Sequence, residues 1–323
     1  MTVGARIGVA TLLLVLLIVG AVAGFVYKRP LTIFVWSNRR QLAGAGLAKA
    51  TVASSMGPQT YWVGGQGPTL VLLHGAGDQA GTWAGVAATL VQRYRLVVPD
   101  LAGHGDSTPA DGPLSVGQVV AGLEAVMNQT KGGPAIIVGN SLGAWVAMLY
   151  AHAHPDQVSR LVLVNGGALR GERSDVSLMP KSREEAAALM TQLRDGASAP
   201  IPGYVLDDVV RTANAGPIAR LSQTATGMEQ YLLDGKLGEV STPVDLLWGL
   251  SDKLFPLSYA SRMTAGLPAS RLTTLVSCGH VPHQECPQRF ETSLSDILKS
   301  AAPSREATPT AADASTPGVE RGK

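Results

Sequence analysis

Apolar and polar residues are distributed along this 323-residue chain so that a membrane-like N-terminal segment precedes a longer globular region. Residues 7–27 are 21 consecutive positions without a charged side chain. A helix rises about 1.5 Å per residue, so this run is long enough to cross about 30 Å of hydrocarbon. We therefore expect a single transmembrane helix within an N-terminal membrane anchor formed by residues 1–29.

A cleaved signal peptide is the alternative interpretation of the same segment. Arg6 precedes an apolar run over residues 7–20, and the Ala-Val-Ala sequence of residues 21–23 is typical of a cleavage site. However, the apolar character continues to Tyr27 and ends only at two basic residues. The uncleaved anchor is the interpretation that we favour.

The segment after the apolar run is basic. Residues 28–40 carry four Lys or Arg side chains, against Arg6 before the run, so the positive-inside bias leans slightly towards a cytoplasmic globular domain. Residues 30–53 begin with a proline and mix Phe34 and Trp36 with basic residues, which predicts a helix lying along the membrane interface. We assign residues 30–59 to this juxtamembrane interfacial segment; a polar linker is the alternative.

In residues 60–300, short apolar runs alternate with longer helix-like stretches. Most of the runs are β-branched and apolar on both faces, as is typical of strands buried in a parallel sheet. The expected strands are residues 70–73, 95–99, 135–138, 161–164, 244–248 and 272–276. The expected helices are residues 82–92, 116–129, 142–153, 257–265 and 288–300. This alternation predicts an α/β fold with a mostly parallel, doubly wound sheet flanked by helices.

Two further segments interrupt or follow this alternation. About 75 residues, 167–241, contain helical pieces with Pro and Gly breaks, which predicts a helical cap inserted above the sheet. Its apolar side chains could line an acyl-chain pocket or form the core of the cap: Met179, Leu189, Met190, Leu193, Tyr204 and Leu206. Residues 301–323 are rich in Ala, Pro, Ser and Thr without periodicity and predict a disordered tail.

The motif that carries chemistry is Gly139-Asn140-Ser141-Leu142-Gly143, between an expected strand and an expected helix. Its glycines permit a sharp turn that holds the serine in a strained backbone conformation at the strand end. The hydroxyl would then stand beside a helix N-terminus, which favours developing negative charge. A bare GxSxG pattern is common by chance, but this strand-and-helix context is much more specific and predicts Ser141 as a nucleophile.

A serine hydroxyl needs a base within hydrogen-bond reach, and six histidines are available. Four lie on the helix after the serine or in His-Gly turns, where surface or structural roles are expected: His74, His104, His152 and His154. His280 and His283 follow the last expected strand instead. We predict that His280, the first after that strand, is the base.

The acid that orients the imidazole should come from another strand end. Asp252 lies just past the strand at residues 244–248, whereas Asp245 lies near its start, at the opposite end of the sheet. The predicted order Ser141, Asp252, His280 is nucleophile, acid, base. A plain turn or helix N-cap is the alternative role for Asp252. The backbone N–H groups of Ala76 and Leu142 are the expected oxyanion donors.

Composition narrows the function classes. With 46% apolar and 15% charged residues, the chain does not have the composition of a disordered protein. It has one long apolar stretch, which excludes a multi-pass membrane protein. Residues 1–77 contain no acidic residue, although the whole chain has 26 basic and 24 acidic residues, a pattern that indicates a membrane rather than a nucleic-acid partner. No zinc spacing is present, and Cys278 and Cys286 are expected to be buried free thiols rather than a bridge.

From about residue 61 to residue 300, the chain resembles the serine α/β-hydrolase superfamily. The resemblance rests on five segments in order: residues 72–75, 99–107, 139–143, 249–252 and 279–287. It implies an α/β-hydrolase domain at residues 60–300 with the triad Ser141, Asp252 and His280. The N-terminal helix and basic stretch are similar to membrane-bound monoacylglycerol-lipase-type and bacterial lipase-type members, although the cap carries no recognised motif of theirs.

The expected function is a membrane-anchored serine hydrolase that cleaves carboxylic esters, in particular lipid esters such as monoacylglycerols, through an acyl-enzyme on Ser141. No metal or organic cofactor is expected; the expected partners are a small-molecule or lipid ester and a membrane. Carbon–carbon bond hydrolysis or cofactor-free perhydrolysis by the same triad is one alternative. A catalytically inactive scaffold that binds lipids or protein partners is another.

Overall fold

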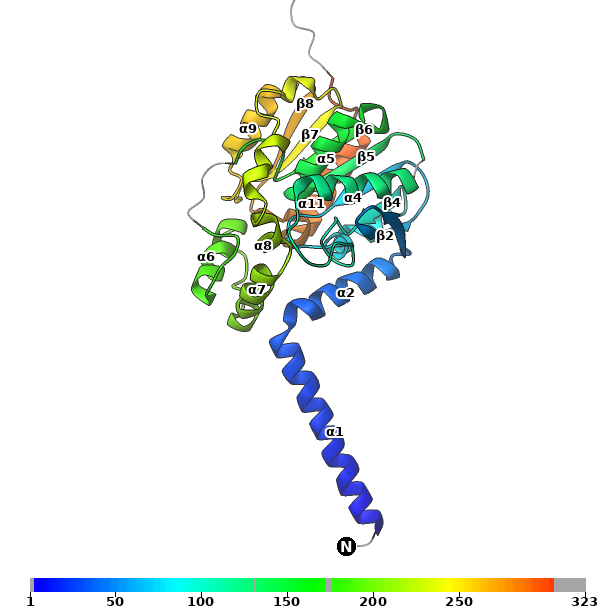
Figure 1. Ribbon diagram of the computed structural model, residues 1–323, viewed down its shortest axis with the longest axis vertical. Helices are drawn as coiled ribbons and strands as arrows, with labels where there is room; N and C mark the ends of the chain where they lie inside the picture. Colours follow the sequence, from blue (N-terminus) through cyan, green and yellow to red (C-terminus); the bar gives the residue numbers. More distant parts are fainter. Residues whose placement is uncertain (1–2, 131, 172–175, 305–323) are drawn as a thin grey trace, which may run out of the picture.

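The computed structural model describes residues 3–130, 132–171 and 176–304. Most of the expected C-terminal tail, residues 305–323, therefore lies outside the described residues. The described chain forms a globular α/β body, from which one long helix projects (Figure 1).

The body is built on an eight-stranded sheet in the order β1-β2-β4-β3-β5-β6-β7-β8. The strands are β1 Ala48–Ser54, β2 Gly57–Gly64, β3 Thr69–Leu73, β4 Arg95–Pro99, β5 Ala135–Asn140, β6 Val158–Val164, β7 Val244–Gly249 and β8 Ser270–Leu275. From β4 to β8 all neighbours are parallel, whereas β1 and β2 pair antiparallel with each other and β2 pairs antiparallel with β4. The expected mostly parallel sheet is confirmed, with all six expected strands inside it.

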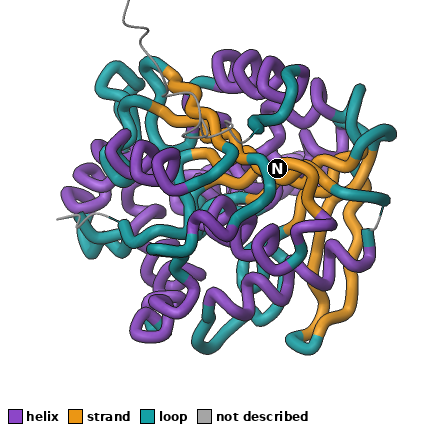
Figure 2. Tube along the Cα trace, turned by 90° about the horizontal axis from the view of Figure 1, so that it is seen from above, coloured by secondary structure: helices purple, strands orange, loops and turns teal. Residues whose placement is uncertain are grey.

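Helices cover both faces of the sheet (Figure 2). Alternate residues of one strand enter different cores: Val71 and Leu73 belong to one buried cluster, Leu70 and Leu72 to the other. The first cluster takes side chains from α4 (Val116–Gln129), α5 (Leu142–Ala153) and α9 (Leu257–Gly266). The second takes side chains from α3 (Ala84–Leu90) and α11 (Pro287–Lys299). This two-sided burial explains why the expected strands are apolar on both faces.

Residues 82–92 were expected to form one helix, and the structure differs there. A 3₁₀ turn, η1 (Ala80–Trp83), precedes α3, and its N-terminus is capped by the Gln79 side chain, which accepts from the Gly81 N–H. The bulky Trp83 at the junction is fully buried between the turn and α11. Trp83 is buried at the point where the 3₁₀ turn becomes the α-helix. The local apolar pattern does not specify this position.

The N-terminal region contains two helices, α1 (Val3–Lys28) and α2 (Pro30–Gly44). Residues 11–28 of α1 have a mean hydropathy of 2.2 and none of that window is buried, so α1 is long and apolar enough to cross a membrane. Pro30 has no backbone N–H to continue the helix, and the chain bends at Arg29. In Figure 1, α1 points away from the body, whereas α2 runs along its edge.

The assignment of residues 30–59 to a juxtamembrane segment outside the domain is wrong in part. The helix begins at Pro30 as expected, but Leu42 is fully buried in the core and β1 and the start of β2 pair within the sheet. Every residue of β1 is exposed or half-buried, and none is fully buried. An edge strand of this kind lacks the apolar run that identified the other strands, and for this reason the domain begins before residue 60.

The insertion between β6 and β7 is helical. It contains α6 (Arg183–Leu193), α7 (Gly203–Ala215), α8 (Pro217–Ser222) and two 3₁₀ turns, η3 (Ala225–Tyr231) and η4 (Leu237–Glu239). α6 and α7 lie on the same side of the body as the junction of α1 and α2 (Figure 1). Of these cap helices, α7 contacts both α1 and α2.

Candidate active site

The turn between β5 and α5 has the geometry that the GxSxG motif predicts. Ser141 has φ 53° and ψ −115°, a left-handed conformation that is strained for a residue with a Cβ. At Gly143 a Cβ would overlap the backbone carbonyl oxygens of Leu73 and His74. At Gly166, in the loop after β6, it would lie 2.6 Å from the Ser141 Cα. The strained turn thus depends on glycines in the motif and in the neighbouring loop.

Asp252 follows β7 and His280 follows β8, and the two side chains form a buried pair. The His280 Nδ1 lies 2.8 Å from the Asp252 Oδ2, and the two residues are 5% and 3% exposed. The Asp252 Oδ1 accepts from the backbone N–H groups of Leu254 and Phe255 at 2.9 and 3.0 Å. These hydrogen bonds hold the carboxylate in a fixed position beside the imidazole.

Two asparagines hold this pair in place, and sequence reasoning missed both of these roles. The Asn165 Nδ2 donates to the Asp252 Oδ2 at 2.7 Å, and its Oδ1 accepts from the Gly249 N–H. The Asn140 Nδ2 donates to the backbone carbonyl of His280 at 2.9 Å. Asn165 directly follows β6 and Asn140 ends β5, so a search for polar residues at strand ends would have found them.

Ser141 and His280 line one cavity of about 600 Å³. Asn140, which precedes the serine, is bonded to the backbone of His280, so the two residues are positioned by a shared contact. The backbone N–H of His280 also donates to the carbonyl of Leu193 at the end of α6, at 2.7 Å. The structure therefore brings Ser141, Asp252 and His280 to one end of the sheet, beneath the cap.

The loop after β3 passes directly beside the serine. A Cβ built on Gly75 would lie 3.3 Å from the Ser141 Cβ, and Ala76 lines the cavity. Leu142 is the first residue of α5, so its N–H is at the N-terminus of that helix. The two expected oxyanion donors thus lie on segments that meet at Ser141.

His74 fixes the shape of that loop. Its Nε2 accepts from the backbone N–H of Leu101 at 2.9 Å, so its Nδ1 carries the proton and donates to the carbonyl of Gly75 at 2.8 Å. Burial lowers the pKa of His74 to about 4, so the ring stays neutral near pH 7. These contacts are those of the structural role expected from the sequence.

His283, the other histidine weighed as a base, is held away from Asp252. Its ring stacks on Trp83 with the centroids 4.0 Å apart, and its Nε2 lies 2.9 Å from the Thr82 Oγ1. Burial lowers the pKa of His283 to about 3, and burial likewise lowers the pKa of His104 to about 3. The structure places His280, and not His283, beside the acid.

The cavity wall is built from three parts of the chain. The loops of the sheet supply the polar end around Ser141, and cap residues Leu189, Met190 and Leu193 supply apolar surface. Leu31 and Val35 of α2 complete the wall, which the sequence did not indicate. Of the six cap residues considered for an acyl pocket, Met179, Tyr204 and Leu206 are not among those that line it.

The expectation of free thiols is wrong, because Cys278 and Cys286 form a disulfide. Between them the chain reverses through the short helix α10 (Pro282–Glu285), which brings the two Cα atoms to 5.9 Å. A spacing of eight residues does not reveal this reversal. The bridge closes the loop that carries His280.

Among the described residues, no group of three or more His, Cys, Asp or Glu side chains is arranged to hold a metal ion.

Comparison with known proteins identifies the relatives of this chain. A family model described as "Alpha/beta hydrolase family" matches residues 70–292. The pimeloyl-acyl-carrier-protein methyl ester esterase of Aromatoleum aromaticum is 31% identical over 252 residues, which cover 72% of this chain and 98% of that protein. The 2-hydroxy-6-oxononadienedioate/2-hydroxy-6-oxononatrienedioate hydrolase of Cupriavidus pinatubonensis is 27% identical over 256 residues, covering 71% and 86%.

A solved structure extends the similarity to the N-terminal part. A membrane phospholipase A, described as a bacterial virulence factor, matches with a TM-score of 0.70 and 26% identity. The match covers 90% of this chain and 99% of that one.

The buried neutral histidines should make the free energy of unfolding depend on pH. Below pH 6.5 the unfolded chain protonates His74, His104 and His283 before the folded protein does, so the free energy of unfolding falls as the pH is lowered towards 4. Asp78 and Asp100 act in the opposite direction, because burial raises the pKa of both carboxyls, that of Asp78 to about 6, and the folded protein binds those protons first. Each group contributes a slope of up to about 1.4 kcal/mol per pH unit, and the three histidines outnumber the two carboxyls.

In the variant His283→Gln, the loss of unfolding free energy between pH 6.5 and pH 4.5 should shrink by about 2 kcal/mol, because one of these groups is removed. Denaturant titrations of the detergent-solubilised protein at both pH values measure this difference. An unchanged loss in the variant would contradict a neutral, buried His283.

Proposed function

Because this chain belongs to the alpha/beta hydrolase family, we propose that it is a serine hydrolase that cleaves carboxylic esters through an acyl-enzyme on Ser141. The observation that carries the proposal is the convergence of the strained Ser141 turn with the buried Asp252–His280 pair at one cavity. Its relatives include an esterase and another hydrolase, which supports hydrolysis as the general reaction.

In the first half of the reaction, the Ser141 Oγ attacks the ester carbonyl carbon while the His280 Nε2 accepts the hydroxyl proton. Asp252, bonded to the His280 Nδ1, holds the ring and stabilises its positive charge. The N–H groups of Ala76 and Leu142 stabilise the tetrahedral oxyanion; such a donor is typically worth about 2.7–4 kcal/mol. The carbon–oxygen bond to the alcohol then breaks, and His280 gives its proton to the departing oxygen.

In the second half, a water molecule attacks the acyl-enzyme. His280 takes one proton from the water as its oxygen bonds to the carbonyl carbon, and a second tetrahedral oxyanion forms. When this intermediate collapses, the bond to the Ser141 Oγ breaks and the serine regains its proton from His280. The products are a carboxylic acid and the free enzyme.

We further propose that the substrate is a lipid ester, such as a monoacylglycerol, and that α1 anchors the protein in a membrane. The cavity wall carries aliphatic side chains from the cap and from α2, the helix that directly continues α1: Leu31, Val35, Leu189, Met190 and Leu193. An acyl chain buried against this surface gains about 0.8 kcal/mol per CH₂ group. Similarity over most of the chain to a membrane phospholipase A is consistent with such a substrate.

Hydrolysis of a carbon–carbon bond in a diketone is the second candidate. It is favoured by one observation, the similarity to the 2-hydroxy-6-oxononadienedioate/2-hydroxy-6-oxononatrienedioate hydrolase of Cupriavidus pinatubonensis. Arg39 and Arg211 also line the cavity, but each is paired with a buried carboxylate, so the aliphatic part of the wall favours an ester with an acyl chain over a dicarboxylate.

The cysteine pair supports a proposal for the side of the membrane on which the domain lies. Disulfides persist in oxidising compartments and are rare where thiols are kept reduced. We therefore propose that the globular domain lies on the oxidising side, because the Cys278–Cys286 bridge outweighs the slight positive-inside bias towards the cytoplasm.

The catalytic proposal predicts that a fluorophosphonate probe labels the wild-type protein and not Ser141→Ala. The same variant should lose ester hydrolysis by about 10⁴-fold or more, because the nucleophile is gone while the fold is kept. Turnover of long-chain monoacylglycerols, diacylglycerols, a soluble acetate ester and a diketone in detergent micelles distinguishes the substrates.

Three outcomes of that panel would count against parts of the proposal. No labelling of folded wild-type protein would favour an inactive scaffold. Cleavage of the diketone without cleavage of esters would favour the second candidate. Equal turnover of long-chain and soluble esters would remove the lipid assignment and leave the serine hydrolase intact.

Asn165 is predicted to be a positioning residue for the acid. Asn165→Gly removes its bond to Asp252 but accepts the left-handed backbone at that position, where φ is 48°. Because a hydrogen bond to a charged group contributes about 1.5–3 kcal/mol, we expect kcat to fall at least about tenfold while KM changes little. The matched variant Asn165→Asp, which faces Asp252 with a second carboxylate, should lose more. Equal kcat in all three proteins would contradict this role.

The compartment is tested by trapping thiols in cells. In acid-quenched cells, a maleimide-polyethylene glycol reagent should leave the wild-type protein unlabelled before reduction and add two labels after it, because both cysteines are in the bridge. Cys278→Ser should accept one label without reduction. Two labels on the unreduced wild-type protein would mean a reducing compartment.

A further inference from the structure

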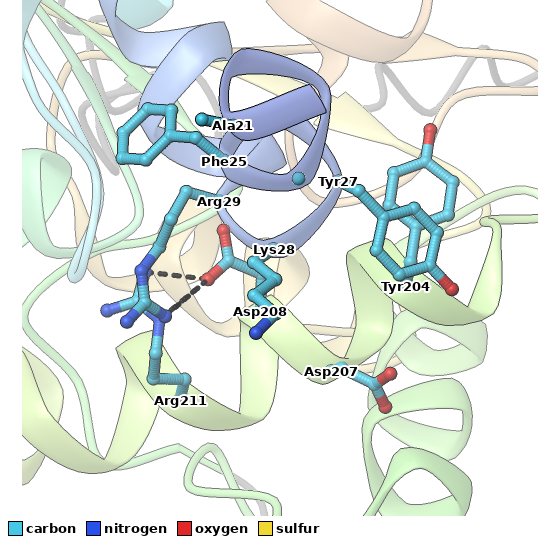
Figure 3. Close-up of a pocket in the computed structure, with 10 residues that line it drawn as sticks. Ala21, Phe25, Tyr27, Lys28, Arg29, Tyr204, Asp207, Asp208 and Arg211 are labelled. Atoms are coloured by element: carbon cyan, nitrogen blue, oxygen red, sulfur yellow. Dashed lines mark hydrogen bonds and ion pairs between the residues drawn. The ribbon is translucent and has the colours of Figure 1, made fainter. Parts of the chain in front are cut away.

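A second cavity, of about 750 Å³, lies where α1 meets the cap helix α7 (Figure 3). The last turns of α1 form one side of it and α7 forms the other. It is separate from the cavity at Ser141, although Arg211 lines both. None of the proposed catalytic residues lines it, so the catalytic proposal does not account for it.

The polar part of this cavity carries an excess of positive charge. Asp208 is 2% exposed and accepts from the Arg211 Nε at 2.7 Å and from the backbone N–H of Leu31 at 3.0 Å. The Arg29 Nη1 lies 3.9 Å from the Asp208 Oδ1, the same oxygen that accepts from Arg211. Figure 3 shows the two guanidinium groups converging on this single acid. One carboxylate cannot neutralise two guanidinium groups.

The remaining charged residues do not correct the excess. Asp207 also lines the cavity, but its carboxylate is paired with Arg183, at 2.9 and 2.6 Å, on α6. Lys28, at the last position of α1, adds a third cation to the wall. The cavity therefore offers an anion site in which three cations face the single carboxylate of Asp208, next to the end of the apolar helix.

The rest of the wall is apolar or aromatic. Ala21, Gly24 and Phe25 come from the part of α1 that is exposed and apolar enough to cross a membrane. The rings of Tyr27 and Tyr204 stack with centroids 5.1 Å apart where the two helices meet. Tyrosine and lysine at the end of an apolar helix are typical of the membrane–water interface. A ligand that fits both parts has an anionic head and a hydrocarbon tail.

We propose that this cavity binds the headgroup of an anionic phospholipid. The phosphate contacts Lys28, Arg29 and Arg211, which donate charge-assisted hydrogen bonds, and an acyl chain lies along Ala21, Gly24 and Phe25. The bound lipid would join α1 to the cap next to the catalytic cavity, which Arg211 also lines. The inference rests on the proposed membrane anchoring and does not require that the lipid be hydrolysed.

The test measures lipid binding to the full-length Ser141→Ala protein in neutral detergent, so that hydrolysis does not interfere. Native mass spectrometry should detect phosphatidylglycerol bound at lower concentration than phosphatidylcholine, which has the same phosphate but no net charge. Lys28→Gln in this background should weaken phosphatidylglycerol binding about fivefold, since a basic residue near a lipid surface contributes about 1 kcal/mol. The exposed position of Lys28 makes this variant safe for folding.

Arg40→Gln is the matched control, because Arg40 is an exposed cation on α2 that lies over the Trp36 ring and does not line the cavity. It should leave phosphatidylglycerol binding unchanged. Equal effects of Lys28→Gln and Arg40→Gln, or equal binding of the two lipids, would overturn the proposal. Displacement of the lipid by millimolar inorganic phosphate would show a free-phosphate site and overturn it too. If esterase activity is absent but these results hold, only the catalytic proposal fails.

Discussion

Ser141 holds a backbone conformation with φ of 53° because four segments approach it more closely than side chains would allow. These are the end of β5, the start of α5 and the loops that follow β3 and β6. Gly143 and Gly166 lack the Cβ atoms that would collide with Leu73, His74 and Ser141 itself. Packing of the surrounding segments offsets the cost of this strained backbone conformation. The strained turn places the Ser141 hydroxyl at the N-terminus of α5 and at the wall of the cavity.

The same sheet edge supports a buried charge. Asp252 is almost inaccessible to water, so its carboxylate is tolerated only because backbone amides, Asn165 and His280 satisfy it. Asn140 fixes the backbone of His280, and the disulfide closes the loop around it. His280 is therefore held by Asp252 after β7, by Asn140 at the end of β5 and by its own disulfide-closed loop. A rigid constellation of this kind spends little free energy on reorganisation during reaction.

The membrane-length helix and the cavity are connected through α2. One side of this helix enters the core at Leu42, another lines the cavity at Leu31 and Val35, and Arg39 pairs with Asp100 and Asp106 at 3.1 and 3.0 Å. Asp208 adds a buried link between the α1–α2 junction and the cap. The helix α1 is thus linked to the cap and to the cavity at Ser141 through α2 and Asp208.

The sequence by itself determined the parallel strands, the Ser141 turn, the expected place of Asp252 and His280 at strand ends, and the apolar helix, because each depends on local periodicity or on glycines in a short motif. Only the tertiary structure decided the rest. The edge strand β1 and the helix α2 carry mixed patterns that suit a bilayer surface as well as a protein core. The Cys278–Cys286 bridge, the supporting Asn140 and Asn165, and the shared contacts of Asp208 join residues that are brought together by chain reversal or by folding, and no local pattern records how distant segments approach one another.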